Sequence, residues 1–152
     1  MKTLTDFISP LTTETVSSQN YEVIENETLS NCNLKNLTFS GSLFSLTLFK
    51  HVTFESCVFF ATRLENCQFV GCKFVNCKFQ FSNLLHSEFK ASHFEGCHWE
   101  VTPVYKSLFS HCFMDAKTIY SVSKDESTRM ENNFSNEQEI SWEDILGQGK
   151  AA

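Results

Sequence analysis

A five-residue period dominates this chain of 152 residues. From Leu34 to Met114, every fifth position is apolar: 11 of these 17 positions are Phe, three are Leu, and the others are Trp, Val and Met. We call this position i. A period of five matches neither an α-helix, whose apolar residues recur about every 3.6 residues, nor a strand that alternates about every two. The pattern therefore predicts a repeat architecture.

Position i−2 of the same repeats is almost always small. It holds Cys seven times, Ser five times and Thr three times, with Leu37 and Val52 as the exceptions. The clearest stretch is NCQFVGCKFVNCKFQ, at residues 66–80. All the cysteines of the protein fall at this position: Cys32, Cys57, Cys67, Cys72, Cys77, Cys97 and Cys112. We interpret them as small, buried, reduced thiols that pack beside the aromatic rings.

In these residues the chain resembles the pentapeptide-repeat family, whose motif has a small residue at i−2, often Asp or Asn at i−1, and Leu or Phe at i. The resemblance covers about residues 24–119. It implies an all-β fold, a right-handed quadrilateral parallel β-helix of about five coils, in which four repeats form one square coil and positions i and i−2 point inward. The chain departs from the motif at i−1, where only Asn33 and Asn83 match, and at i−2, where Ala is usual. These departures weaken any function that depends on acidic faces.

A coil of four repeats places residues 20 apart in one column. Phe49, Phe69 and Phe89 then stack at about the 4.8 Å separation of neighbouring strands, which suits offset aromatic rings. Position i+2 would form the corners, and it often carries Asn or Gly, which tolerate turn geometry. These corner residues are Asn26, Asn31, Asn36, Gly41, Asn66, Gly71, Asn76 and Gly96.

The two ends of such a solenoid need caps, because open strand edges invite aggregation. We expect residues 1–23 to form an N-terminal cap, residues 24–119 the solenoid, and residues 120–152 an acidic C-terminal linker with a short helix. Within the last segment, SKDESTRMENN reads as a flexible polar linker. Ser135 and Gln138 form a capping box that predicts a helix at about 136–146, stopped by Gly147. A shorter helix beginning at Ser141 is the alternative.

Charge and composition restrict the class of protein. The net charge is −6, but residues 24–119 carry eight acids and eight bases, so the acidity belongs to the ends. The chain lacks the clustered Lys and Arg residues that a nucleic-acid-binding protein uses to contact phosphates. The chain has neither the long apolar run of a transmembrane helix nor the apolar core of a signal peptide. An odd number of cysteines without an export signal favours a reducing cytoplasm. We therefore predict a cytoplasmic protein that binds neither nucleic acid nor membrane.

The sequence predicts no enzyme, no cofactor and no metal site. Consecutive cysteines would lie on different walls of a core that Phe already fills, unlike the paired ligands of zinc sites. No phosphate-binding glycine loop, Ser-His-Asp signature or metalloprotease motif is present. The histidines occupy outward positions and are expected to be solvated surface residues: His51, His86, His93, His98 and His111.

Outward apolar residues are the best indication of function. Phe81 and Val101 occupy i+2, and Leu85 and Tyr105 occupy i+1 of the following repeats, with Phe60 nearby. We expect them to form one contiguous strip at one corner, which could be a protein-binding site or a dimer seam. Alternatively, a terminal segment folds back and covers the strip. A second cluster is expected to be covered by residues 1–20: Leu43, Leu46 and Leu48.

These observations predict a non-enzymatic interaction scaffold or regulatory binding module with a rigid surface. The partner is expected to be another protein or a second copy of this chain, and the sequence does not identify it. The alternative comes from the family resemblance: some bacterial pentapeptide-repeat proteins resemble duplex DNA, bind gyrase or topoisomerase IV, and protect it from quinolones or toxins. That mechanism needs an anionic rod, whereas the predicted solenoid is neutral.

Overall fold

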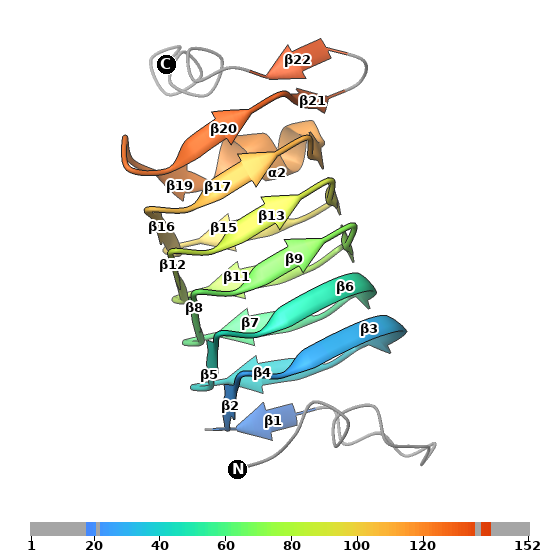
Figure 1. Cartoon of the computed structure of the whole chain (residues 1–152), viewed down its shortest axis with the longest axis vertical. Coiled ribbons are helices and arrows are strands. Elements are labelled where there is room, and N and C mark those ends of the chain that lie inside the picture. The colour runs from blue at the N-terminus through green and yellow to red at the C-terminus, as the bar shows by residue number, and fades with distance from the viewer. Residues whose placement is uncertain (1–17, 21, 136–137, 141–152) are drawn as a thin grey trace.

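The computed structural model describes residues 18–20, 22–135 and 138–140. The chain winds upward as a right-handed parallel β-solenoid of about six turns (Figure 1). The repeat architecture predicted from the five-residue period and the parallel β-helix implied by the family resemblance are both confirmed. The rod is about one turn longer than predicted, because paired strands begin before residue 24 and continue beyond residue 119.

The coils have four walls, and two of them consist of short strands stacked in parallel register. Wall A, at the back of Figure 1, contains β1 (Ser18–Asn20), β4 (Thr38–Ser40), β7 (Val58–Phe60), β11 (Lys78–Gln80) and β15 (His98–Glu100). Wall B, on the left of Figure 1, contains β2 (Val23–Glu25), β5 (Leu43–Ser45), β8 (Arg63–Glu65), β12 (Asn83–Leu85), β16 (Pro103–Tyr105) and β19 (Ser123–Lys124).

The other two walls share strands that run around the corner between them. These strands are β3 (Thr28–Lys35) and β6 (Leu48–Glu55). Wall C continues with β9 (Gln68–Val70), β13 (Glu88–Lys90), β17 (Leu108–Ser110) and β20 (Arg129–Glu131). Wall D continues with β10 (Lys73–Val75), β14 (His93–Glu95), β18 (Phe113–Met114) and β21 (Asn133–Ser135), and β22 (Gln138–Ile140) pairs antiparallel with β21.

The predicted aromatic columns form the core. Phe49, Phe69 and Phe89 stack with ring centroids 4.7 and 4.6 Å apart and nearly parallel planes. Phe74 is fully buried and lies 4.8 Å from the rings below and above it in its own column. The strand register explains the stacking, because each residue pairs with the residue 20 positions later. The offset stacks add to the apolar area that the coils bury.

Small residues at i−2 satisfy the backbone inside the rod. The hydroxyl of Ser82 donates to the carbonyl of Phe59 at 2.9 Å and accepts from the backbone N–H of Thr62 at 3.0 Å. The thiol of Cys77 donates in the same way to the carbonyl of Phe54 at 3.2 Å. Six of the seven free cysteines are buried and Cys32 is half-buried, as the interpretation of the thiols predicts. Position i−2 therefore selects a short side chain with a donor, because buried carbonyl groups need a partner.

The C-terminal part differs from the prediction. Helix α2 (Ala116–Ser121), which the sequence analysis missed, takes the place of a strand on wall A and packs against β15. Asp115 caps it and also accepts a hydrogen bond from the backbone N–H of Gly96 at 2.7 Å. The linker predicted at residues 123–133 is wrong, because β19 and β20 continue walls B and C there.

The helix predicted at about 136–146 is wrong where the structure describes that segment. Gln138–Ile140 is a strand, β22, which pairs with β21 across a short hairpin. Residues 136–137 and 141–146, including the alternative start at Ser141, lie outside the described residues. Most of the N-terminal cap predicted at residues 1–23 also lies outside them, but Ser18–Asn20 pairs with β4 as part of wall A.

Candidate interaction surface

The outward apolar residues predicted from the sequence all lie on or beside wall B. Phe81 is 53% exposed and Val101 is 67% exposed. Phe60 and Tyr105 are also exposed, whereas Leu85 is half-buried. No described segment covers the exposed members of this group, so the surface is open within the described residues.

The structure corrects the prediction that these residues share one corner. Phe81 and Val101 lie at the corner between walls A and B, immediately before β12 and β16. Leu85 and Tyr105 are register partners at the far ends of these strands, beside the next corner. The sequence argument treated i+2 of one repeat and i+1 of the next as neighbours, although a whole strand separates them. The residues therefore border the two edges of wall B instead of lining one corner.

The first edge is a packed aromatic cluster. The rings of Phe60 and Phe81 lie 5.7 Å apart in an edge-to-face arrangement. Phe60 ends β7 on wall A, one coil below Phe81. The predicted proximity of Phe60 is therefore confirmed for Phe81, and the apolar surface extends around the corner onto wall A.

Two residues on this edge have an unfavourable backbone conformation. Phe81 has φ +52° and Val101 has φ +45°, in the left-handed region. Gly41 occupies the equivalent corner two coils below Phe81, and most other corners of this kind carry Asn, Gly, Ala, His or Ser. A β-branched residue such as Val is a genuine outlier in this region. A large, exposed, apolar side chain at such a position weakens the coil instead of stabilising it.

Wall B carries no charge at the coils that hold this surface. Between its two edges lie Asn83 and Pro103, and neither β12 nor β16 contains a charged residue. One coil below, Arg63 forms an ion pair with Glu65. At the far corner stand His86 and Lys106, and beside Val101 stands Glu100, whose carboxylate accepts a hydrogen bond from the side chain of Gln80 at 3.2 Å.

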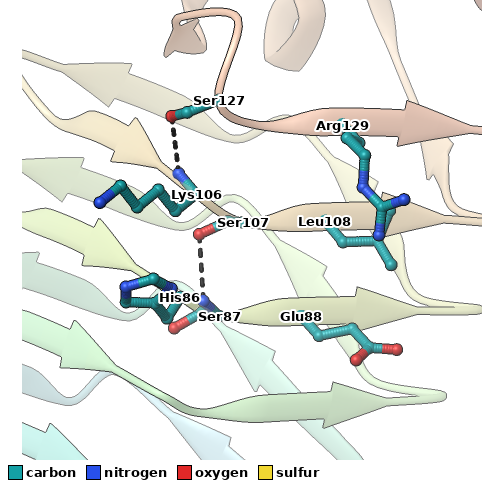
Figure 2. Close-up of a pocket in the computed structure, with 8 residues that line it drawn as sticks. All are labelled: His86, Ser87, Glu88, Lys106, Ser107, Leu108, Ser127 and Arg129. Atoms are coloured by element: carbon teal, nitrogen blue, oxygen red, sulfur yellow. Dashed lines mark hydrogen bonds between the residues drawn. The ribbon is translucent and has the colours of Figure 1, made fainter.

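A shallow depression lies beyond the far edge, at the corner between walls B and C. Figure 2 shows that His86 and Lys106 point to one side of it, whereas Glu88 and Arg129 lie on the other side. Arg129 is also paired with Glu131 at 3.2 Å. The charged groups therefore do not converge on one point, which a bound ion or a reacting atom would need.

The regular coil changes at this depression. At most other corners the backbone N–H donates to a backbone carbonyl of the next coil, as His86 does to Tyr105 at 3.1 Å. The N–H of Lys106 donates instead to the hydroxyl of Ser127 at 2.8 Å (Figure 2). The carboxylate of Asp125 accepts a hydrogen bond from that hydroxyl in turn. One extra residue in this coil causes the change, since Leu108 pairs with Arg129 across 21 positions instead of 20.

The histidines are dispersed over the outside of the rod. His51, His86, His98 and His111 are exposed, as predicted, but His93 is half-buried because it stacks on Phe113 at 4.5 Å. Partial burial lowers the pKa of His93 below its ordinary value. Within the described residues, no group of three or more His, Cys, Asp or Glu side chains could hold a metal ion.

Two exposed aromatic residues were missed by the sequence analysis. Phe134 in β21 contacts Phe113 edge-to-face at 5.8 Å, which extends the ring pair of Phe113 and His93 along wall D. Tyr120 projects from α2 and is exposed. A resumption of the repeat could have revealed Phe134, because Thr128 and Asn133 are buried at i−2 spacing after the one-residue insertion.

Acidic and basic side chains alternate around the rod. Wall A carries Lys78 and Glu100, and wall B carries Arg63 and Glu65. Walls C and D also carry both signs, for example Lys50 with Glu88 and Lys73 with Glu95. No wall of the described solenoid is continuously negative.

The sequence analysis expected residues 1–20 to cover a second apolar cluster. In this cluster, Leu46 is exposed, whereas Leu43 and Leu48 are half-buried. Most of residues 1–20 lie outside the described residues.

Residues 57–96 match the family model of pentapeptide repeats in eight copies. The same five-residue coil geometry continues on both sides of the matched segment. This match confirms, for the matched residues, the resemblance to the pentapeptide repeats that the motif indicates. Among the described residues, no helix is both long and apolar enough to cross a membrane.

Several solved structures are similar in part. The pentapeptide repeat protein Rfr23 from the cyanobacterium Cyanothece 51142 is 10% identical, over 80% of this chain and 88% of that chain, with a TM-score of 0.49. QnrB1, a plasmid-mediated fluoroquinolone resistance protein, is 15% identical, over 76% of this chain and 92% of that chain, with a TM-score of 0.26. HetL, a pentapeptide repeat protein from Nostoc that is involved in heterocyst differentiation regulation, is 8% identical, over 75% of this chain and 74% of that chain, with a TM-score of 0.19. These similarities carry no argument about function, and no curated protein matches the chain.

Proposed function

We propose that this protein is a non-enzymatic interaction scaffold that binds another protein chain through wall B and the corner beside it. The observation that carries the proposal is the presence of Phe81 and Val101 at corner positions. Both side chains are exposed, so they contribute little to the core, and both hold an unfavourable backbone conformation. Contact with a partner accounts for these residues, because it would bury the apolar surface that folding leaves open.

The surface has the composition of a binding site. Phe and Tyr are common among the residues that contribute most to protein interfaces, and charged residues are depleted at interface centres. Here Phe60, Phe81 and Tyr105 surround a centre without charge. The rigid parallel coils beneath reduce the entropy that ordering this surface on binding would cost. The free, mostly buried thiols support a cytoplasmic setting for the protein.

The topoisomerase-binding alternative receives no support from the surface charges. A protein that imitates DNA needs a continuous band of negative charge, whereas every wall of the described solenoid carries both signs. We therefore favour recognition through apolar contacts over recognition through an anionic rod.

The test compares two variants designed to keep the fold. Phe81→Asn/Val101→Asn places at both corners a residue that other corners, such as Asn66 and Asn76, already use with positive φ. Ala91→Asn introduces the same residue at an exposed corner with positive φ between walls C and D, away from wall B. Quantitative proximity labelling in the native host should identify proteins that are enriched with wild type and with Ala91→Asn but lost with the double variant. Equal enrichment with all three baits would contradict the proposal.

A further inference from the structure

We infer that the corner between walls C and D binds an acidic peptide segment of a partner protein, held in an extended conformation along the rod. This corner lies diagonally opposite the corner that holds Phe81 and Val101, so the inference goes beyond the proposed function. It rests on a line of positive side chains that contains no acidic residue and ends at an exposed aromatic ring.

The positive side chains come from four successive coils. Residues 50–53, 70–73, 90–93 and 110–113 turn this corner, on the right of Figure 1, and they contain three Lys, three His and no Asp or Glu. In the same coils, the segments that turn the other three corners each include at least one acidic residue: examples are Glu100, Glu65 and Glu95. Since the coil gathers residues that are far apart in the sequence, we name the group the basic stripe: Lys50, His51, Lys73, Lys90, His93 and His111.

The lysines of the basic stripe have no acidic partner. Lys50, Lys73 and Lys90 are exposed, and none of them forms an ion pair with another described residue. By contrast, Arg63 and Arg129 each pair with a glutamate on their own strand. An acidic ligand would therefore meet cations that no described carboxylate neutralises, which is the charge complementarity that protein interfaces use.

Aromatic rings continue the basic stripe toward the C-terminal end of the rod. His93 stacks on Phe113 with ring centroids 4.5 Å apart, and Phe134 contacts Phe113 edge-to-face at 5.8 Å. These three residues follow Lys73 in one column of wall D, one in each coil. Phe134 is 44% exposed. A ligand that fits the whole surface therefore carries acidic residues and, at one end, an apolar residue.

The geometry favours a peptide over a nucleic acid. Single-stranded nucleic acids stack their bases on aromatic faces, but the rings of His93 and Phe113 cover each other, with planes 13° apart. Free backbone N–H groups could hold a phosphate, but the corner N–H groups of three successive coils here donate to carbonyls of the next coil. Glu88 on wall C and Glu95 on wall D flank the basic stripe and would repel a wide polyanion. An extended acidic peptide is narrow enough to follow the lysines alone.

The spacing of the coils sets the length of the ligand. Lys50 and Lys90 lie two coils apart, which is about 10 Å at the usual separation of neighbouring strands. Four coil spacings separate Lys50 from Phe134, so the whole surface is about 19 Å long and matches an extended chain of about six residues. Exposed ion pairs are individually weak and are screened by salt. Binding should therefore be weak and should decrease as salt is added.

The test uses a fluorescent hexaglutamate peptide with a leucine at each end, titrated with the full chain at low salt. The same peptide with glutamine in place of glutamate is the control ligand and should not bind. Lys50→Gln/Lys73→Gln/Lys90→Gln should raise the Kd of the acidic peptide at least about fivefold, because it removes three ion pairs. Phe134→Ser should weaken binding of this peptide but leave binding of hexaglutamate without leucine unchanged.

Lys78→Gln/Lys106→Gln/Lys117→Gln is the matched control variant. It removes three exposed lysines from wall A, from the corner between walls B and C, and from α2. Its net charge equals that of the variant in the basic stripe, so only the positions of the lost charges differ. It should change the Kd of the acidic peptide by less than about twofold, because long-range attraction between exposed charges is largely screened.

Carbodiimide cross-linking locates the bound peptide. The reagent joins a carboxylate to a lysine amine that touches it, so mass spectrometry of the wild-type complex should find the peptide attached to Lys50, Lys73 or Lys90. Attachment mainly to Lys78, Lys106 or other lysines would place the peptide elsewhere and overturn the inference.

The remaining outcomes are equally decisive. Selective loss in the variant of the basic stripe supports the inference. Equal loss in both triple variants means that the peptide responds only to net charge, and this overturns it, as does an absence of binding at the highest protein concentration. A single-stranded thymidine oligonucleotide that binds more tightly than the peptide, and is lost in the same variant, would make the ligand a nucleic acid and also overturn it.

The proposed function is tested separately. Phe81→Asn/Val101→Asn should bind the acidic peptide as wild type does, because it leaves the opposite corner unchanged. Ala91→Asn keeps every charge of the basic stripe and remains a valid control for wall B. Failure of the peptide to bind would therefore leave the proposed contact through wall B untouched.

Discussion

Replacing Val101 with Asn should make the isolated protein more stable. Val101 has φ +45° and is 67% exposed. A left-handed conformation costs an ordinary L-residue about 1–2 kcal/mol, whereas Asn visits it routinely. The change also removes apolar contact, but only about one third of the side chain is buried, so the loss is about 0.5 kcal/mol out of the roughly 1.5 kcal/mol for a fully buried Val. The net gain should be about 1 kcal/mol.

Urea denaturation followed by circular dichroism measures this difference, and thermal unfolding provides an independent value. A gain of about 1 kcal/mol corresponds to a rise in Tm of about 2–4 °C for a chain of this size. Leu46→Asn is the matched control for backbone strain: Leu46 has φ +51° and is also largely exposed, at the other edge of wall B, two coils below His86. It should gain a similar amount, because the same relief of backbone strain operates there.

A loss of stability in Val101→Asn, with a gain in Leu46→Asn, would refute this reasoning. It would mean that Val101 makes stabilising contacts within the folded chain and that its exposure has another cause. Equal gains in the two variants, with partner binding lost in Val101→Asn, would separate the two roles of Val101. The residue would then weaken the coil and strengthen the contact with a partner.

Three further predictions concern the core and the cap. Phe74→Ala should destabilise the rod by about 3–5 kcal/mol, while Lys73→Ala, its exposed neighbour, should cost less than about 0.5 kcal/mol in urea denaturation; equal losses would contradict the register. Burial raises the pKa of the Cys67 thiol to about 11, above its unfolded value, so its contribution to stability should be lost as pH rises from about 9 through 11. Between pH 9 and 11, Cys67→Ser should therefore lose less free energy of unfolding than wild type. Burial also lowers the pKa of Lys124, which changes stability in the opposite direction, but Lys124 is present in both proteins and its effect cancels in the comparison. Partial burial opposes ionisation of Asp115, but hydrogen bonds to its carboxylate lower its pKa overall; Asp115→Ala should cost about 1–2 kcal/mol at neutral pH, and thermal unfolding should show this difference disappear as pH falls through the lowered pKa.

The core could be predicted from the sequence because it depends on one local rule repeated many times. Once i and i−2 are known to point inward, the column of Phe49, Phe69 and Phe89 follows from the coil length alone. The C-terminal end could not be predicted in this way. One inserted residue near Ser127 shifts the register, so the buried Thr128 and Asn133 no longer fall on the counted positions. Counting every fifth residue without allowing an insertion therefore loses the repeat at this point, although the coil continues.

Helix α2 escaped prediction for a related reason. Ile119 lies at position i and is buried, as its column requires, so the repeat seems to continue through it. The local signal is Asp115, whose side chain accepts from the N–H of Thr118 as an N-cap. Whether residues 116–121 form another strand or a short helix depends on this N-cap and on packing against β15. The five-residue period contains no information about either.

The placement of the surface residues required knowledge of where each coil turns. Phe81 and Leu85 are only four positions apart and both point outward, so the sequence suggests neighbours, yet β12 lies between them. The left-handed residues at the corners supply the missing information, because Phe81 and His86 mark the two ends of one wall. That separation gives the surface two different edges. A surface confined to one corner could contact a partner only along a line, whereas two apolar edges on one wall allow a partner to contact the uncharged face between them.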